Sequence, residues 1–264
     1  MRPGLVLVVL VGGAAAAAPL VAPYDPTALT SAQLESPSFS HLMGTDGLGR
    51  DVFSRVLFGA RLSLGAAFVT LTLIVTIGLT IGVVAGYYGG WVDSVLMRAA
   101  DVILAVPTVV LALAIIGLLQ TGLTSVILAL SGVWWVGYGR LARGLVLAAR
   151  ERAFVESARA LGASDLRIIA RHLLPNVIPT VLVLATLDIG AVMLAVSALN
   201  FLGLGVMPPT PEWGAMINEG KNALFVAPHV ALFPGLALTL TVFGLNLIGE
   251  GLADRTSAAV GHSR

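Results

Sequence analysis

One carboxylate stands inside an otherwise uncharged stretch of the sequence. Asp188 lies about eleven residues into the apolar segment from about 177 to 202. An ionised carboxylate at bilayer depth is costly, so such a group normally faces a bundle interior or an aqueous cavity. There it could attract a cation, form a structural hydrogen bond to a neighbouring helix, or carry a proton. Asp188 is therefore a candidate for a substrate path, with the two structural interpretations left open.

Two residues of a nucleophile motif occur, but the motif is incomplete. Ser131 precedes a glycine within an apolar run, yet Ala129 stands where a Gly-x-Ser-Gly turn would need another glycine. All four histidines lie outside the expected membrane spans, so none is placed to serve as the base for this serine. We predict no catalytic residue. An intramembrane hydrolase, or a channel, is kept as the alternative of a different class.

The chain also lacks a complete phosphate-binding loop. Ala215 stands where such a loop needs its first glycine, and Asn222 follows Lys221 where the loop needs serine or threonine. Cysteine is absent, which excludes disulfides and thiolate metal sites. We predict no cofactor and no metal site, so any nucleotide hydrolysis must take place in a partner.

The composition indicates that lipid surrounds much of this chain. Hydrophobic residues make up 57% of the 264 residues and charged residues only 11%, whereas a soluble domain carries about 25% charge. Too little polar surface remains to cover a water-facing domain. The net charge of +1 and the absence of a basic run argue against nucleic acid as a partner.

Five apolar segments are long enough to cross a bilayer. A helix crosses roughly 30 Å of hydrocarbon with about 20 apolar residues. The segment from 102 to 139 would span roughly 57 Å as one helix at about 1.5 Å per residue, so it must turn, and we expect the turn at Gln120-Thr121-Gly122. The sequence predicts an all-α, polytopic membrane bundle of about six transmembrane helices. The segments run from about Gly4 to Ala22, Leu62 to Tyr87, Val102 to Gly139, Val177 to Leu202 and Val230 to Leu252.

Basic residues predict the orientation, because arginine and lysine accumulate on the cytoplasmic side. With the N-terminus inside, eleven basic residues lie inside and four outside. Both termini are therefore predicted to be cytoplasmic. The first segment also resembles a cleavable signal peptide, because Arg2 precedes it and a run of alanines follows. Pro19 would be a poor first residue of a mature chain, so we expect a retained anchor, with the signal peptide as the alternative.

The second apolar segment carries glycines at a spacing of four residues. This spacing places them on one helix face, where small residues let another helix backbone approach closely. We expect a helix-packing face, and a role in the substrate path is the alternative. The glycines are Gly78, Gly82 and Gly86, and Gly90 continues the pattern.

The loop between the fourth and fifth spans carries seven of the fifteen basic residues, yet it is amphipathic. Phe154, Ala158 and Leu161 recur at helical spacing. Gly162 stands where a helix would end in a left-handed residue, and Ser164 can cap a second helix that ends near residues 174–176. Two short helices hinged at Gly162 are predicted, either as a solvated surface loop or as a docking element for a cytosolic partner.

The spacing within this loop resembles the EAA loop of ABC-importer permeases. Residues 156–158 are followed after three residues by a glycine, and after nine more by His-Leu-Leu-Pro. In that family the loop is a coupling helix that seats in a groove of the ATP-binding subunit. Ser157 replaces the usual alanine, and His172 stands where many members have isoleucine. The resemblance implies that coupling to the ATPase involves Glu156, Ser157, Ala158, Gly162, Leu174 and Pro175.

Two further stretches, 42–55 and 201–214, resemble the dipeptide, oligopeptide and nickel branch of these permeases. The resemblance implies a type I ABC-importer permease fold in a bacterial inner membrane. It also implies a second permease subunit in a heterodimer, two cytosolic ATPase subunits and an external substrate-binding protein. We expect an N-terminal anchor and external segment over residues 1–60, a permease domain over 61–253 and a cytoplasmic tail over 254–264.

The cargo is suggested only by short stretches. Residues 184–190, which include Asp188, resemble nickel-importer permeases. Val196 occupies a place where peptide permeases often have glutamate. Ala191 and Ala195, however, stand where nickel permeases can carry histidines. We expect nickel or a nickel chelate as the cargo, with dipeptides or oligopeptides as the alternative.

Overall fold

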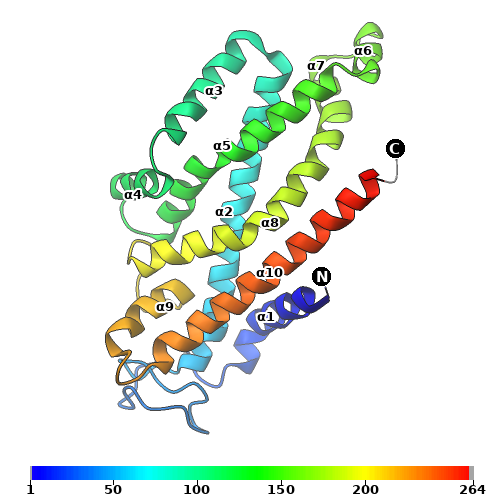
Figure 1. Ribbon diagram of the computed structural model, residues 1–264. Helices are drawn as coiled ribbons and strands as arrows, with labels where there is room; N and C mark the ends of the chain where they lie inside the picture. Colours follow the sequence, from blue (N-terminus) through cyan, green and yellow to red (C-terminus); the bar gives the residue numbers. More distant parts are fainter. Residues whose placement is uncertain (1, 262–264) are drawn as a thin grey trace. The chain divides into compact units, whose positions relative to one another are not determined.

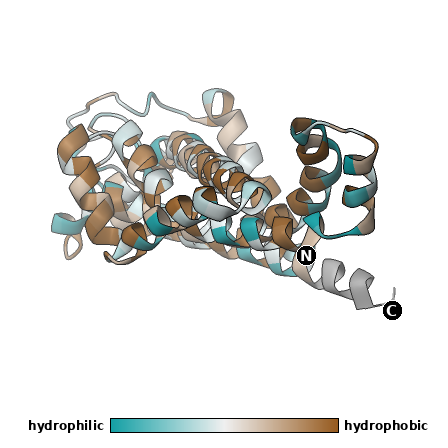
Figure 2. Ribbon diagram, turned by 90° about the horizontal axis from the view of Figure 1, so that it is seen from above, coloured by the Kyte–Doolittle hydropathy of each residue, from teal (hydrophilic) through white to brown (hydrophobic). Residues whose placement is uncertain are grey.

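The computed structural model describes residues 2–261, and the side chains of residues 2–253. Within that part of the chain, five helices are long and apolar enough to cross a membrane, or six if one bent helix pair is counted as a single span. Figure 2 shows hydrophobic residues, in brown, along most of the helices. The prediction of an all-α polytopic bundle with about six transmembrane helices is confirmed.

The elements succeed one another along the chain with one long loop, residues 22–51, between the first two helices (Figure 1). The described elements are α1 (Arg2–Val21), α2 (Val52–Tyr88), α3 (Gly90–Leu104), α4 (Thr108–Leu119), α5 (Leu123–Arg150), α6 (Ala153–Ala160), α7 (Asp165–Ile168), a π-helical stretch (Ile169–Leu173), α8 (Leu174–Phe201), α9 (Trp213–Gly220), a 3-10 turn (Lys221–Ala223) and α10 (His229–Gly261).

The third apolar segment is divided twice. The expected turn at residues 120–122 is present, and Gln120 there has a φ of 71°. A second break separates α3 from α4, whose axes differ by 94°. Pro107 lies in this break, and proline disfavours helical geometry in the residue before it. The sequence prediction of one helix from 102 to the turn was therefore wrong, because it overlooked this proline.

The loop after α5 also differs from its prediction in one respect. α6 and α7 form the two expected short helices, and Gly162 between them has a φ of 76°. The second helix does not end near residues 174–176. It passes through the π-helical stretch directly into α8. A π-helical turn widens the backbone, which lets the chain continue past Pro175 instead of stopping there.

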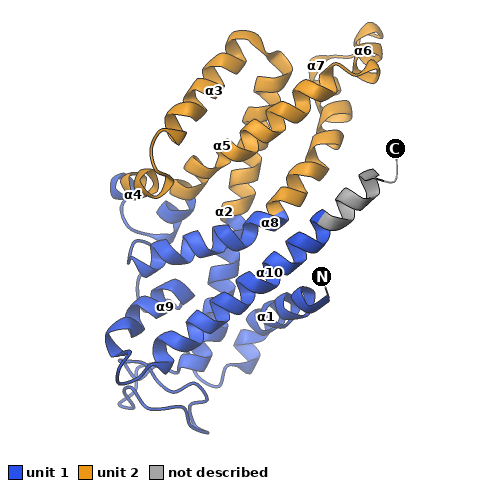
Figure 3. Cartoon of the chain, viewed as in Figure 1, with its two compact units in different colours: residues 1–69, 116–127, 186–264 blue, residues 70–115, 128–185 orange. Residues whose placement is uncertain are grey.

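The chain forms two compact units (Figure 3). Unit 1 comprises residues 1–69, 116–127 and 186–264, and unit 2 comprises residues 70–115 and 128–185. α2, α4, α5 and α8 each contribute residues to both units. The expected boundary after residue 60 falls within α2. Of the expected tail, residues 254–261 continue α10, and residues 262–264 lie outside the described residues.

The core of unit 1 is built around Trp213, which is 1% exposed and packs with residues of α2, α8 and α10. α1 lies beside α10 (Figure 1). Gly4 makes this approach possible, since a Cβ there would lie 2.7 Å from the carbonyl oxygen of Gly244. The apolar N-terminal segment is thus packed as a helix of unit 1.

In unit 2 the glycine face of α2 lies directly against the backbone of α5. A Cβ on Gly78 would lie 2.7 Å from the carbonyl oxygen of Trp135, and one on Gly86 would lie 2.9 Å from that of Arg143. At Gly82 the carbonyl oxygen of Gly139 is closer still. Real Cβ atoms do not tolerate such distances, so α2 and α5 can meet at this separation only through glycine.

Candidate coupling loop and substrate path

The EAA-like residues lie on α6 and at the junction with α8. Glu156 and Ser157 are exposed on α6, and Ala158 is half-buried. The loop is held in unit 2 by a different set of side chains, Val155, Ile168 and Leu173, each fully buried. Val155 and Ile168 were not singled out from the sequence, although their apolar character was available. Leu174 is half-buried and Pro175 is exposed, both in the first turn of α8.

The tip of the loop presents apolar side chains to the outside of the described chain. Leu161 is 88% exposed and Leu166 is 77% exposed, one on either side of the hinge at Gly162. The sequence prediction used Leu161 to define an apolar face, and that residue points outward.

The hinge itself is a closed helix end. The amide of Ala163 donates to the carbonyl oxygen of Ala158 at 3.0 Å, and the amide of Gly162 donates to that of Arg159 at 3.0 Å. A bond that spans five residues next to a left-handed glycine is the usual way to terminate a helix. Ser164 occupies the N-cap position of α7, but its side chain makes no cap hydrogen bond.

The start of α7 is tied to the end of α2, and the end of α2 is tied to the end of α5. The hydroxyl of Tyr87 donates to Oδ1 of Asp165 at 2.6 Å. Nη1 of Arg150 donates to the carbonyl oxygen of Gly86 at 3.1 Å. A cavity of about 300 Å³ lies here, lined by Tyr87, Arg150, Glu151, Glu156 and Arg159. Tyr87 was not singled out from the sequence, because nothing local marks a tyrosine that bonds 78 residues away.

A second cavity lies in unit 1, against α8 and α10. Its volume is about 290 Å³, and its lining includes Asn246 and Glu250, one helical turn apart on α10. Both are exposed, and Gly190 of α8 packs closely on the side-chain oxygen of Asn246. Polar groups on a membrane-spanning helix normally face an aqueous cavity or another protein chain. The remaining lining residues are Leu187, Ala191 and Leu194.

Asp188 follows Leu187 on α8 and is half-buried. The sequence drew attention to Asp188 but not to Asn246 and Glu250. A spacing of four residues within the last apolar segment was the signal that could have found them. Among the described residues, no three histidine, cysteine, aspartate or glutamate side chains are grouped so that they could hold a metal ion.

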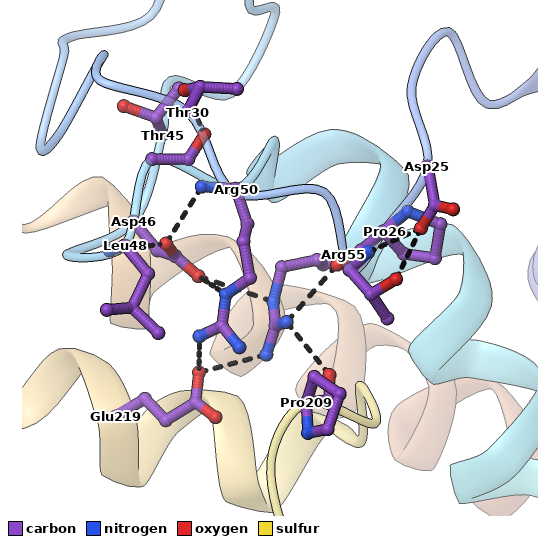
Figure 4. A network of polar contacts seen from close by, with 12 residues as sticks. Asp25, Pro26, Thr30, Thr45, Asp46, Leu48, Arg50, Arg55, Pro209 and Glu219 are labelled. Atoms are coloured by element: carbon purple, nitrogen blue, oxygen red, sulfur yellow. Dashed lines mark hydrogen bonds and ion pairs between the residues drawn. The ribbon is translucent and has the colours of Figure 1, made fainter.

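The long loop before α2 is fixed to α9 by a buried ion-pair network (Figure 4). Arg50 bonds Oδ2 of Asp46 through Nε and Oε2 of Glu219 through Nη2, both at 2.6 Å. Nη2 of Arg55 donates to the same Glu219 oxygen at 2.9 Å. Both arginines are almost completely buried. Sequence analysis counted them only as external basic residues and assigned them no structural role.

A second buried carboxyl fixes the loop after α8. Glu212 is fully buried and accepts hydrogen bonds from the hydroxyl of Ser63 at 2.8 Å and the amide of Ala215 at 2.9 Å. Burial raises the pKa of the Glu212 carboxyl above its usual range, and these hydrogen bonds partly oppose the shift. Nε1 of Trp213 donates to the carbonyl oxygen of Val56 at 2.9 Å. The loop is thereby tied to α2.

Comparison with known proteins gives one family. Residues 78–261 match the model described as binding-protein-dependent transport system inner membrane component. The nickel transport system permease protein NikC of Escherichia coli (strain K12) is 44% identical over 255 residues, which cover 96% of this chain and 92% of that relative. The glutathione transport system permease protein GsiD of Pectobacterium atrosepticum is also 44% identical, over 220 residues covering 83% of this chain and 73% of that relative.

Solved structures support the fold. An inward-facing conformation of the MetNI methionine ABC transporter matches with a TM-score of 0.57 at 19% identity, over 79% of this chain and 97% of that chain. An amino acid ABC transporter solved with histidines matches with a TM-score of 0.56 at 15% identity, over 77% of this chain and 94% of that chain. At these identities the likeness concerns the fold alone, which is that of a type I permease.

Proposed function

This chain belongs to the family of binding-protein-dependent transport system inner membrane components, and on that premise we propose that it passes nickel or a nickel chelate through an ATP-driven importer. The observation that carries this proposal is the extent of the likeness to a nickel permease, which reaches 96% of the chain and 92% of the relative. The likeness to the glutathione permease leaves more of both chains unmatched.

The cavity on α8 and α10 suits such a cargo. Glu250 offers a carboxylate and Asn246 an amide oxygen, and oxygen ligands or bound water can receive a hydrated cation or a polar chelate. We assign Asp188 to the same path, because an ionisable side chain within a membrane-spanning helix normally faces such a path; Asp188 is not among the residues that line this cavity. A chelate needs no protein ligand to its metal, so Ala191 and Ala195 do not oppose this cargo.

Import of a small peptide is the second candidate, because a glutathione permease shares the same identity of 44%. The carboxylate of Glu250 could then receive the ammonium group of a peptide. The two cargoes differ in what competes for uptake, and this difference decides between them.

The coupling loop is the site where ATP hydrolysis acts on this chain. The exposed side chains of Leu161 and Leu166 would seat in the cytosolic ATPase, and Gly162 would let the two short helices adjust to it. Closure of two ATPase subunits would then shift the loop and alternate access to a path shared with a second permease. The coupling residues are Glu156, Ser157, Ala158, Gly162, Leu174 and Pro175.

The proposed assembly implies an orientation. The coupling loop must face the ATPases in the cytoplasm, and both termini then lie on the same side as the excess of basic residues. The loop before α2, which Arg50 ties to Glu219 of α9, would face an external substrate-binding protein. We propose a division into an anchor and external segment over 1–60, a permease over 61–253 and a tail over 254–264, with the first boundary inside α2 and residues 254–261 as the end of α10.

Uptake of radioactive nickel tests the cargo. Cells with and without this gene are compared, and unlabelled dipeptides or glutathione are added as competitors. Loss of nickel uptake in the deletion strain, without competition by peptides, is the expected result. Unchanged nickel uptake together with lost growth on peptides would overturn the nickel proposal and leave the peptide permease in its place.

A further inference from the structure

We propose that Tyr87 is a positioning residue that transmits movement of the coupling loop to α2 through its hydrogen bond to Asp165. The inference rests on the proposed coupling function of the loop. It adds a residue outside the EAA-like pattern and identifies the helix on which the loop acts.

The contact between the two residues is short and partly buried, because Tyr87 is buried while Asp165 is exposed. The Tyr87 hydroxyl donates to Oδ1 of Asp165 at 2.6 Å, and the Tyr87 side chain is buried, with 8% of its surface exposed. A hydrogen bond to a carboxylate is roughly twice as strong as one between neutral groups. Asp165 is the first residue of α7, three residues after the hinge at Gly162. A displacement of the loop at this hinge would therefore reach Asp165 within a few residues.

The Tyr87 backbone is fixed as firmly as its side chain. Nη1 of Arg150 donates to the carbonyl oxygens of Gly86 and Tyr87, at 3.1 and 3.4 Å. These carbonyls belong to the last turn of α2, where helical partners are missing. Gly86 also packs on Val146 and on the backbone of Arg143. The end of α2 cannot follow the loop alone, and the end of α5 moves with it.

α2 is suited to carry a displacement away from this contact. It runs unbroken from Val52 to Tyr88, and its sequence contains no proline. An uninterrupted α-helix keeps its hydrogen-bond ladder, and kinks arise at prolines and π-bulges. The other route out of the loop, into α8, begins with a π-helical stretch and contains Pro179. The rigid route therefore starts at Tyr87.

The test uses the whole importer, with ATPases and binding protein, in proteoliposomes. Tyr87→Phe keeps the ring and removes the hydroxyl. We expect the amount of cargo transported per ATP hydrolysed to fall severalfold, because the loop is then no longer tied to α2 by this hydrogen bond. Tyr88→Phe makes the same change at an exposed neighbour and should leave this ratio at the wild-type value.

Changes at the other partner separate coupling from general packing. Asp165→Asn keeps an acceptor oxygen and should retain most of the ratio, whereas Asp165→Ala should reproduce the loss. Because both single changes remove the same contact, Tyr87→Phe combined with Asp165→Ala should be no worse than either alone. If Tyr87→Phe prevents assembly with the ATPases, the two Asp165 variants carry the test.

Gly162→Pro is measured in parallel, so that the role of Tyr87 and the coupling function of the loop are tested separately. If Gly162→Pro abolishes coupled transport while Tyr87→Phe and Asp165→Ala both leave the ratio unchanged, the proposed function stands and the role of Tyr87 is wrong. If Gly162→Pro also leaves transport and stimulated ATPase activity intact, the coupling function itself is wrong.

Discussion

Ser63 of α2 and Glu212 of the loop before α9 form a buried hydrogen bond, with the hydroxyl oxygen 2.8 Å from Oε1 of the carboxyl. The same hydroxyl oxygen accepts the amide of Trp213 at 3.1 Å. One serine thus satisfies a buried carboxyl and a backbone amide that lie about 150 residues further along the chain. Buried polar groups of this kind are costly if one partner is removed.

The buried position of Glu212 predicts a pH dependence of stability. Burial raises the pKa of this carboxyl in the folded chain, so the folded state binds the proton more tightly than the unfolded state. Its contribution to stability is fully present below the unfolded pKa and is lost as pH rises through the folded pKa. We expect the Tm of the wild type, relative to Glu212→Gln, to fall as pH rises above the ordinary carboxyl range. Thermal unfolding in detergent across that range measures this, and a constant difference would contradict it.

The network around Glu219 predicts a loss of stability when its charge is removed. Glu219→Gln leaves the guanidinium groups of Arg50 and Arg55 buried with half of their compensating charge. Breaking a fully buried pair costs about 3–5 kcal/mol. The Glu219 side chain is 21% exposed, so we expect about 2–3 kcal/mol.

Asp101→Asn serves as the matched control for this change, because Asp101 pairs with Arg140 at a site where both side chains are about half exposed. Such pairs contribute about 0–1 kcal/mol. Thermal unfolding of both variants gives the comparison, and equal losses of stability would show that burial of the network is unimportant.

The close approach of α2 to α5 predicts opposite effects of the same substitution at two glycines. Gly82→Ala would place a Cβ well under 3.0 Å from the carbonyl oxygen of Gly139, so the helices must separate and stability falls by about 1–3 kcal/mol. At Gly65, also on α2, a Cβ meets nothing within 4 Å among the described neighbours. Gly65→Ala should therefore stabilise the helix by about 0.5–1 kcal/mol. The yield of folded protein and the Tm of each variant test whether stability falls in Gly82→Ala and rises in Gly65→Ala.

The long helices could be predicted because they follow from the length of apolar segments alone. Breaks within them depend on local backbone chemistry, and Pro107 could have been recognised from the sequence by its effect on the preceding residue. The π-helical entry to α8 could not, because Pro175 and Pro179 ordinarily indicate a helix end. Only the three-dimensional packing of Ile168 and Leu173 shows that the helix continues.

The hydrogen-bonded residue pairs that fix the long loops could not be predicted from the sequence, for a different reason. Arg50 and Glu219 are separated by 169 residues and Ser63 and Glu212 by 149. No periodicity relates residues so far apart. The coupling loop was recognisable because its pattern is compact, but its buried side was misassigned, since Val155 rather than Leu161 faces the unit.

The polar face of α10 yields the last prediction. Glu250→Gln keeps the size and hydrogen bonding of the side chain but removes its charge from the cavity that it shares with Asn246. If a cation or a cationic group passes here, the maximal rate of uptake should fall at least severalfold, with assembly unchanged. Asp101→Asn removes the charge of an exposed carboxylate on α3 that does not line this cavity, and it is the matched control.

Asp188→Asn completes this comparison, because Asp188 is assigned to the same path. Equal losses of uptake in Glu250→Gln and Asp188→Asn, with Asp101→Asn like the wild type, would place both carboxylates on the route of the cargo. A loss of stability in Asp188→Asn without a change in the uptake rate per folded importer would instead make Asp188 a structural residue. An uptake rate that is unchanged in Glu250→Gln would show that the cargo does not depend on charge in this cavity.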